Sequence, residues 1–170
     1  GAQGDRVYVV MALNNVEIRS LGGFAGQACR VSVSNGAVML GDVRSVYDYI
    51  PSDDEWARVP LSDEEIQLYS DSVGYIAGNT CFIPDFPRVC DIWGQLWATF
   101  QGEYVDGIIA LDPVLLQMLM ALTGGAQMYD GTRLDGTNTV RVLLHDTYWN
   151  YMDDADAMDA YFAQAASTAL

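Results

Sequence analysis

The sequence predicts a three-layer-like α/β sandwich, in which a mixed β-sheet carries packed helices. The apolar run Arg6–Leu13 is typical of a strand that is covered on both faces. Residues Gln27–Ser34 alternate between polar and apolar side chains, as a half-buried strand does. Further along the chain, helical patterns alternate with strand patterns. Because a helix between two strands implies a crossover connection, part of the sheet should be parallel.

The first half of the chain is expected to contain a hairpin and then a loop-rich segment. Ser34-Asn35-Gly36 is a hairpin-turn signal, and Ala37–Val43 should return as the partner strand of Gln27–Ser34. Residues 51–83 contain prolines, glycines and two acidic clusters, which favour loops over long regular elements.

Two helices are predicted on either side of residue 80. A short one covers Ser62–Ser70, because Ser62 is a capping residue and Glu65 occupies the capping-box position. A longer one opens at Phe86-Pro87, with proline at the first helical position, and stops at Gly102. Its apolar stripe has helical spacing and consists of Val89, Ile92, Trp93, Leu96, Trp97 and Phe100.

The last third of the chain continues the alternation. A strand is predicted at Val105–Leu111, and Asp112-Pro113 should cap a helix over Val114–Leu122 that stops at Gly124-Gly125. Three further elements follow: a short strand at Ala126–Tyr129, a helix capped by Thr137 or Asn138 that runs to about Tyr151, and a helix opened by acidic residues 153–159.

The composition excludes several partners. The net charge is −15, from 23 acidic residues against 8 basic ones, all of them arginine. Nucleic acid and anionic membrane surfaces require a basic footprint, so we expect no nucleic acid partner and membrane contact only through a segment outside these residues. Codon bias in a GC-rich genome is one explanation for the missing lysines. The alternative is that some of these arginines serve bidentate anion binding, since arginine binds phosphate and carboxylate in this manner.

Cysteine and histidine usage limits the possible metal and redox chemistry. Cys29, Cys81 and Cys90 are an odd number, and Cys81 and Cys90 would close a loop if they paired in an exported protein. No Cys-x-x-Cys motif occurs and His145 is the only histidine, which argues against a zinc site. His145 has no recognisable Ser or Cys partner and is predicted to be structural.

The segment after the first strand is the main candidate site. It carries amides, one acid, one arginine and glycines whose backbone allows close approach, at the carboxyl end of a strand where open α/β sheets bind ligands. The candidate ligand-binding residues of this segment are Asn14, Asn15, Glu17, Arg19, Gly22 and Gly23. It matches neither a Walker loop nor a dinucleotide fingerprint, and a polar turn is the alternative interpretation.

Two further acids are candidates for a magnesium site. Asp85 stands at the entrance of a helix, where it either holds a divalent cation or caps the helix. Asp106 and Asp112 bracket a strand about 20 Å long and cannot share one ion. Because Asp112 is expected to be a helix cap, Asp106 is the remaining candidate. The acidic run at 153–159 lacks the glycine and terminal Glu of an EF-hand loop.

Three motifs in order resemble a bacterial family catalogued as domain of unknown function 4012. They are Asn14-Asn15-x-Glu17-x-Arg19-x-x-Gly22-Gly23-Phe24-x-Gly26, then Pro84-Asp85-Phe86-Pro87, then Val105-Asp106-Gly107-Ile108-Ile109-Ala110-Leu111-Asp112-Pro113. The resemblance implies a cell-surface protein of Gram-positive bacteria with a membrane segment before this domain.

Residues Gly102–Gly136 are also similar to the LytR-CpsA-Psr family. That family transfers glycopolymers from polyprenyl pyrophosphate carriers to the cell wall, with arginines on the pyrophosphate and carboxylates on magnesium. In this chain the arginine-rich tract of the family is reduced to Arg141, and the Pro-Arg-Asp segment is missing. The similarity implies the fold, while fold alone does not establish the activity.

Two hypotheses follow for residues 1–170, which we expect to form one extracytoplasmic domain of a longer membrane-anchored protein. In the first, the domain binds or transfers a polyprenyl-pyrophosphate-linked glycopolymer. Arg19 would then contact the anion, Arg141 would contribute to binding, and Asp85 or Asp106 would hold Mg²⁺, with Arg19 and Asp85 as the catalytic pair. In the second, it is a non-enzymatic module for envelope assembly or adhesion, in which Glu17 and Arg19 satisfy each other or the local backbone.

Overall fold

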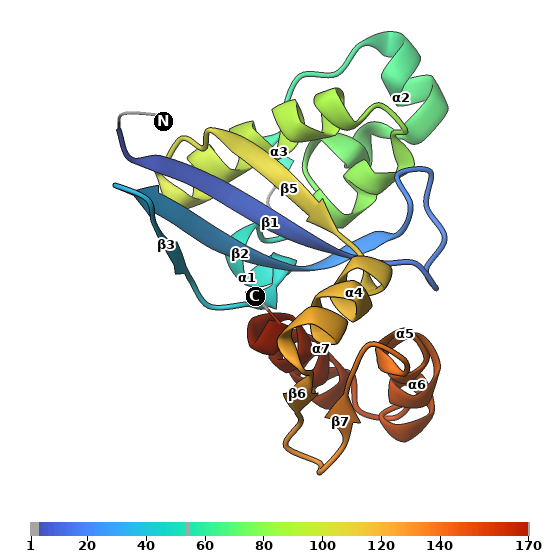
Figure 1. Ribbon diagram of the computed structural model, residues 1–170. Helices are drawn as coiled ribbons and strands as arrows, with labels where there is room; N and C mark the ends of the chain where they lie inside the picture. The colour runs from blue at the N-terminus through green and yellow to red at the C-terminus, as the bar shows by residue number, and fades with distance from the viewer. Residues whose placement is uncertain (1–3, 54, 170) are drawn as a thin grey trace.

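The computed structural model describes residues 4–53 and 55–169 and confirms the mixed α/β architecture. The central strand β1 (Arg6–Asn14) pairs antiparallel with β2 (Phe24–Ser34) and parallel with β5 (Gly107–Leu111). The strand order of the main sheet is β3-β2-β1-β5, with β4 (Arg44–Ser45) also paired to β2 (Figure 1). The parallel pair is the one joined by the predicted crossover.

The hairpin differs from its predicted bounds in two places. Strand β2 begins at Phe24 rather than Gln27, because the ladder with β1 continues past an irregularity in which Gly26 has no partner opposite it. Strand β3 (Ala37–Leu40) ends before the predicted Val43. The chain then enters β4 and a short helix α1 (Val46–Tyr49).

One face of the sheet is covered by α3 (Phe86–Gln101), the long helix that the sequence predicts. Its buried stripe packs against the side chains that β1 directs to this face, and Trp93 is fully buried there. The helix ends at Gly102, which adopts a left-handed conformation with φ 68°. The main core therefore lies between α3 and the sheet (Figure 1).

The loop-rich segment 51–83 contains more helical structure than its composition suggests. Three 3₁₀ turns, η1 (Glu55–Ala57), η2 (Asp71–Gly74) and η3 (Ala77–Phe82), accompany the predicted helix, which is α2 (Asp63–Tyr69). The capping box is present: the Glu65 amide donates to the Ser62 hydroxyl at 3.2 Å, and the Ser62 amide donates to the Glu65 carboxylate at 2.7 Å.

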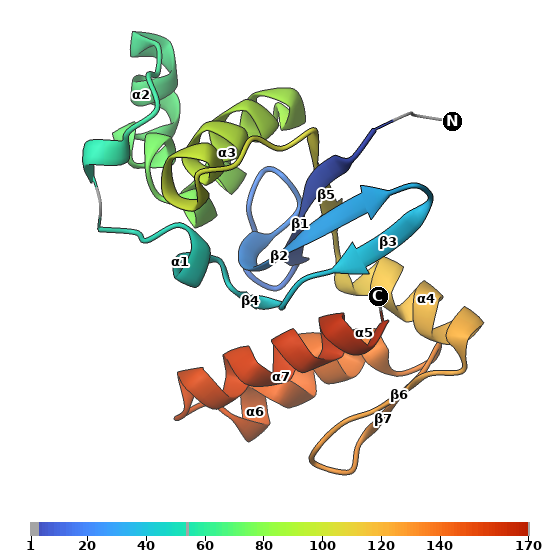
Figure 2. The same cartoon turned by 90° about the vertical axis from the view of Figure 1, so that its left-hand side faces the viewer.

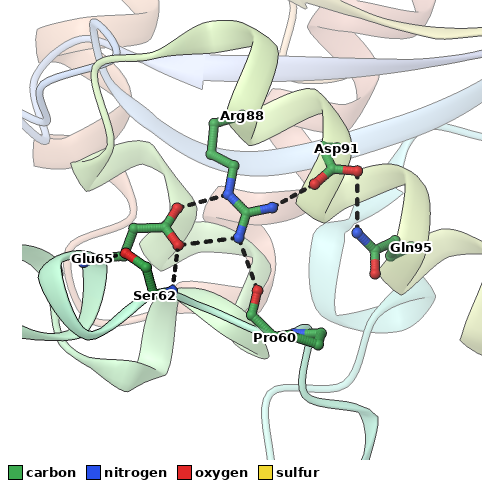
Figure 3. Close-up of polar contacts among 6 residues, drawn as sticks. All are labelled: Pro60, Ser62, Glu65, Arg88, Asp91 and Gln95. Atoms are coloured by element: carbon green, nitrogen blue, oxygen red, sulfur yellow. Dashed lines mark hydrogen bonds and ion pairs between the residues drawn. The ribbon is translucent and has the colours of Figure 1, made fainter.

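The same carboxylate binds Arg88, so that the capping box of α2 is tied to the first turn of α3 (Figure 3). Arg88 Nε donates to Glu65 Oε1 at 2.6 Å, Nη2 donates to the Pro60 carbonyl at 2.8 Å, and Nη1 donates to Asp91. The side chains of Arg88 and Glu65 are only 24% and 21% exposed. This network fixes α2 against α3.

Replacing Arg88 with methionine is expected to destabilise the fold by about 1–2 kcal/mol at neutral pH, because a partly buried carboxylate loses its charged partner. Arg88 and the Ser62 amide lower the pKa of Glu65. The stabilisation is therefore present above the unfolded-state pKa and is lost as the pH falls through the lowered folded-state pKa.

Urea titrations of the wild type and the Arg88→Met variant from neutral to acidic pH measure this difference. Their free energies of unfolding should converge at acidic pH. Arg141→Met, which removes an exposed ion pair with Asp146, is the control and should change little. A constant gap between wild type and Arg88→Met at every pH would contradict this account.

The second face of the sheet meets a C-terminal layer. Helix α4 (Pro113–Thr123) starts where predicted, with the Leu115 amide donating to Asp112 Oδ1 at 2.8 Å. The next elements are β6 (Ala126–Gln127), β7 (Arg133–Leu134), α5 (Thr139–Arg141), the π turn η4 (Val142–Asp146), α6 (Thr147–Asn150) and α7 (Ala155–Ala169). Figure 2 shows α7 beneath the sheet, on the side opposite α3.

Two details of the C-terminal layer differ from the predictions. Strand β6 ends at Gln127, because Met128 and the following residues turn back towards β7. The predicted single helix to Tyr151 is divided by the π turn. Asn138 stands at its N-cap position, but its side chain bonds the Arg133 carbonyl and the Asp135 amide instead of the helix.

The C-terminal layer has its own core, distinct from the one beneath α3. On the sheet face that it covers, the buried hydrophobic residues Val10, Cys29 and Val31 form a small cluster. In the described residues, no helix is long and apolar enough to cross a membrane. The space between this face of the sheet and the C-terminal helices is the place where the structure leaves a cavity.

Candidate functional site

The loop between β1 and β2 is held by its own polar groups. Asn15 Nδ2 donates to the Gly22 carbonyl at 2.7 Å, and the Val16 amide donates to Asn14 Oδ1 at 3.1 Å. The Gly22 amide donates to the Arg19 carbonyl at 3.0 Å. Several groups predicted to bind a ligand therefore also shape the loop.

The two adjacent glycines of the loop have different structural roles. Gly22 has φ +111°, a conformation that L side chains rarely adopt, and no atom lies near the position of an added Cβ. Gly23 is required for close approach, since a Cβ there would lie 2.6 Å from the Asn14 carbonyl oxygen. Both residues are explained by the backbone of the loop.

Arg19 lies against aromatic rings. Its guanidinium carbon is 4.7 Å from the ring centroid of Phe82 and 5.6 Å from that of Phe24. Nη1 donates to the Ile18 carbonyl at 3.0 Å, while Nε is buried without a partner. Across residues 4–53 and 55–169, no carboxylate forms an ion pair with Arg19. A charged donor is thus held in place by stacking.

Glu17 and Asn14 meet a residue that sequence reasoning missed. The Tyr148 hydroxyl, from α6, donates to Glu17 Oε1 at 3.3 Å and accepts from Asn14 Nδ2. Burial, followed by the charge of Glu17, raises the pKa of Tyr148 to about 12, so this hydroxyl stays protonated. No local pattern marks Tyr148, because its partners are more than 130 positions away in the sequence.

Asn14 and Glu17 line an apolar cavity of about 100 Å³ between the sheet and the C-terminal helices. Its volume is of the same order as the roughly 150 Å³ engineered cavity that binds benzene. Its walls come from β1, β2, the start of α4, the π turn and α7, and its apolar lining includes Val10, Leu13, Phe24, Val43, Leu111, Leu116, Leu143, Leu144, Phe162 and Ala166.

Gln27 is the buried polar residue of this cavity. It is only 4% exposed; its Nε2 donates to Asp159 Oδ1 at 3.2 Å, and its Oε1 has no partner. A buried amide oxygen without a donor is costly unless water or a ligand satisfies it. The sequence does indicate that Gln27 is buried, because residues 27, 29 and 31 lie on the same face of a strand and the other two are the apolar Cys29 and Val31.

The three cysteines are free thiols, so Cys81 and Cys90 do not form the disulfide that would close the loop between them. Cys29 lies on the cavity wall, and burial raises its pKa to about 11. Burial also raises the pKa of Cys81 and Cys90. The chain therefore presents no activated thiol nucleophile at the cavity.

The structure does not bring the remaining predicted site residues to this cavity. Asp106 is bound to Arg6 and accepts from the Val7 amide at 2.8 Å, at the start of β1. Asn14 is seven positions after Val7, which is about 23 Å along a strand. Arg141 is exposed and paired with Asp146 at 3.1 Å.

Asp85 and Asp106 do not share a site either. Asp85 is exposed at the N-cap of α3, with no capping hydrogen bond from its side chain, and Asp106 follows the other end of that helix. A helix of 16 residues spans about 24 Å. In the described part of the chain, no group of three His, Cys, Asp or Glu side chains is placed to hold a metal ion.

The fold and the site define a mixed α/β domain with an apolar cavity between its sheet and its C-terminal helical layer. The chain belongs to the family described as protein of unknown function DUF4012, whose pattern matches residues 3–148. No curated protein matches the chain.

Among solved structures, the chain is similar to the transcriptional regulator YvhJ from Bacillus subtilis. The two are 13% identical, with a TM-score of 0.47, and the similarity covers 99% of this chain and 70% of that one. The resemblance to the LytR-CpsA-Psr family stays a prediction.

Proposed function

We propose that this domain binds an amphipathic cell-envelope ligand on the extracytoplasmic side of the membrane and performs no covalent chemistry on it. The apolar part of the ligand enters the cavity, and its polar part lies at the β1–β2 loop. The observation that carries this proposal is the cavity itself, whose lining is mostly apolar and includes a few polar side chains, among them Asn14, Glu17 and Gln27. An apolar pocket with a few polar groups is the usual form of a small-molecule site.

The size of the cavity limits how much ligand it takes. A space of about 100 Å³ accommodates one end of a hydrocarbon chain rather than a whole lipid. The remainder would extend past Asn14 and Glu17, which also line the cavity. A lipid-linked glycan fits this division, because its sugar hydroxyls suit amide and carboxylate acceptors.

Transfer of a glycopolymer from a polyprenyl pyrophosphate is the second candidate. Arg19 favours it, because this arginine stacks on Phe24, a ring that lines the cavity, and forms no ion pair with a described carboxylate. The carboxylates of Glu17, Asp112 and Asp159 on the same cavity oppose a bare pyrophosphate. Mg²⁺ delivered with the ligand would be needed to offset them.

Calorimetry with geraniol, geranyl pyrophosphate and inorganic pyrophosphate, each with and without Mg²⁺, separates the two candidates. We expect geraniol to bind, and Ala166→Leu, which fills the cavity, to abolish that binding. Ala163→Leu is the matched control, because Ala163 is on the same helix but does not line the cavity.

The outcomes distinguish the candidates clearly. Binding of geranyl pyrophosphate that depends on Mg²⁺ and is lost in Arg19→Ala would favour the transferase-like function. Absence of binding by either isoprenoid to a folded sample would overturn both. Equal binding to the Ala166→Leu and Ala163→Leu variants would place the ligand elsewhere.

A further inference from the structure

The polar groups at one end of the cavity are nearly all hydrogen-bond acceptors. Gln27 Oε1 is buried and unpartnered, and its own amide nitrogen is already used by Asp159. Glu17 lines the same cavity and accepts one bond, from Tyr148. A ligand group that fits this end must therefore bring donors rather than acceptors.

The negative charge at this end has no arginine counter-charge. Of the arginines in the described residues, none forms an ion pair with Glu17 or Asp159; their salt bridges lie elsewhere on the surface. Arg19 is close in sequence to Glu17, but its guanidinium lies over the rings of Phe24 and Phe82. Among the described residues, the charges of Glu17 and Asp159 are therefore not offset by an arginine ion pair.

The pKa of Asp159 also reflects the negative charge at this end of the cavity. Partial burial raises the pKa of Asp159, and the charges of Asp156, Asp48 and Glu17 raise it further. These acids come from α7, from α1 and from the β1–β2 loop, so negative charge surrounds the carboxylate from three elements. A bound cation would relieve this repulsion.

We propose that this end of the cavity binds a primary ammonium group carried by an otherwise apolar ligand. The three N–H donors of an ammonium match Gln27 Oε1 and the carboxylates of Asp159 and Glu17, while the hydrocarbon portion fills the apolar depth. This inference rests on the proposed ligand-binding function and defines its ligand as a cationic amphiphile.

Calorimetry with hexylammonium, hexanol and hexyl phosphate tests the head group at constant chain length. Hexylammonium is expected to bind at least roughly fivefold more tightly than hexanol, the factor that a partly exposed charge pair provides. Hexyl phosphate is expected to bind most weakly. Asp159→Asn and Gln27→Met should each reduce the preference for ammonium, whereas Asp153→Asn, which removes an exposed acid just before α7, should preserve it.

The result separates this inference from the proposed function. Equal binding of hexanol and hexylammonium would overturn the ammonium site and leave the apolar cavity as a ligand site. Tighter binding of hexyl phosphate would also overturn it and would favour the pyrophosphate ligand. If none of the three binds to the folded protein, both proposals fail.

Discussion

Replacing Trp93 with alanine is expected to destabilise the domain by about 3–5 kcal/mol, the range observed when a large core aromatic residue is truncated. Trp93 is fully buried in the core between α3 and the sheet, and its indole nitrogen donates to the Thr80 hydroxyl at 2.8 Å. Truncation leaves a cavity in the main core and removes a bond between α3 and η3. The free energy of unfolding in urea measures the loss.

Two further variants divide this effect into packing and hydrogen bonding. Trp93→Phe retains much of the packing and should cost less than the alanine variant. Thr80→Val leaves the indole N–H buried without an acceptor, at a cost of about 1–3 kcal/mol. Trp149→Ala is the control, because Trp149 is 68% exposed. Similar losses at Trp93 and Trp149 would contradict the assignment of the core.

Replacing Gly23 with alanine is the second large expected effect. The added Cβ would lie 2.6 Å from the Asn14 carbonyl oxygen and 2.7 Å from its carbonyl carbon. Backbone atoms cannot yield as the end of a flexible side chain does. The β1–β2 loop must therefore shift, and we expect a loss of about 2 kcal/mol or more in the free energy of unfolding.

Gly26→Ala is the matched control for Gly23→Ala. Gly26 lies on the same segment, but its added Cβ would meet only the Phe24 ring, at 3.4 and 3.5 Å, which is ordinary contact. Thermal unfolding of the two variants should therefore differ clearly, with Gly23→Ala the less stable. Equal melting temperatures would contradict the close approach of the two chain segments.

The Gly23→Ala substitution should also affect ligand binding at the cavity. The carbonyl that it would displace belongs to Asn14, whose side chain holds the Tyr148 hydroxyl at the border of the cavity. We therefore expect Gly23→Ala to weaken ligand binding even at temperatures where the variant is folded. In this account the glycine acts through the loop and not by contact with the ligand.

Most of the architecture could be predicted from local patterns. The capping box at Ser62 and Glu65, the Asp112 cap and the glycine stop at Gly102 are local signals, and the structure confirms each of them. Each satisfies backbone groups within a few residues, so no distant contact is needed to interpret it. The bounds of β2 were wrong because pairing across a bulge depends on the partner strand.

The candidate site was predicted less completely than the fold. The sequence directs attention to the carboxyl end of β1, where Asn14 and Glu17 do border the cavity. The sequence also keeps Asp106 as a candidate, because Asp112 is expected to be a helix cap, whereas Asp106 lies at the other end of the sheet, bound to Arg6. Asp106 precedes β5, whereas Asn14 ends β1; because these two strands are parallel, the two residues lie at opposite ends of the sheet.

By itself, the sequence of this protein determined its longer helices and strands, the caps at Ser62 and Asp112, the mixed sheet and its strongly acidic character, because these follow from local chemistry and composition. Only the tertiary structure decided that Arg19 stacks on aromatic rings, that Tyr148 meets Glu17, and that Gln27 faces a cavity with an unpartnered oxygen. The physical reason is that cavities and their polar borders arise from the packing of elements far apart in the chain. A cavity formed in this way cannot be predicted from a local sequence pattern.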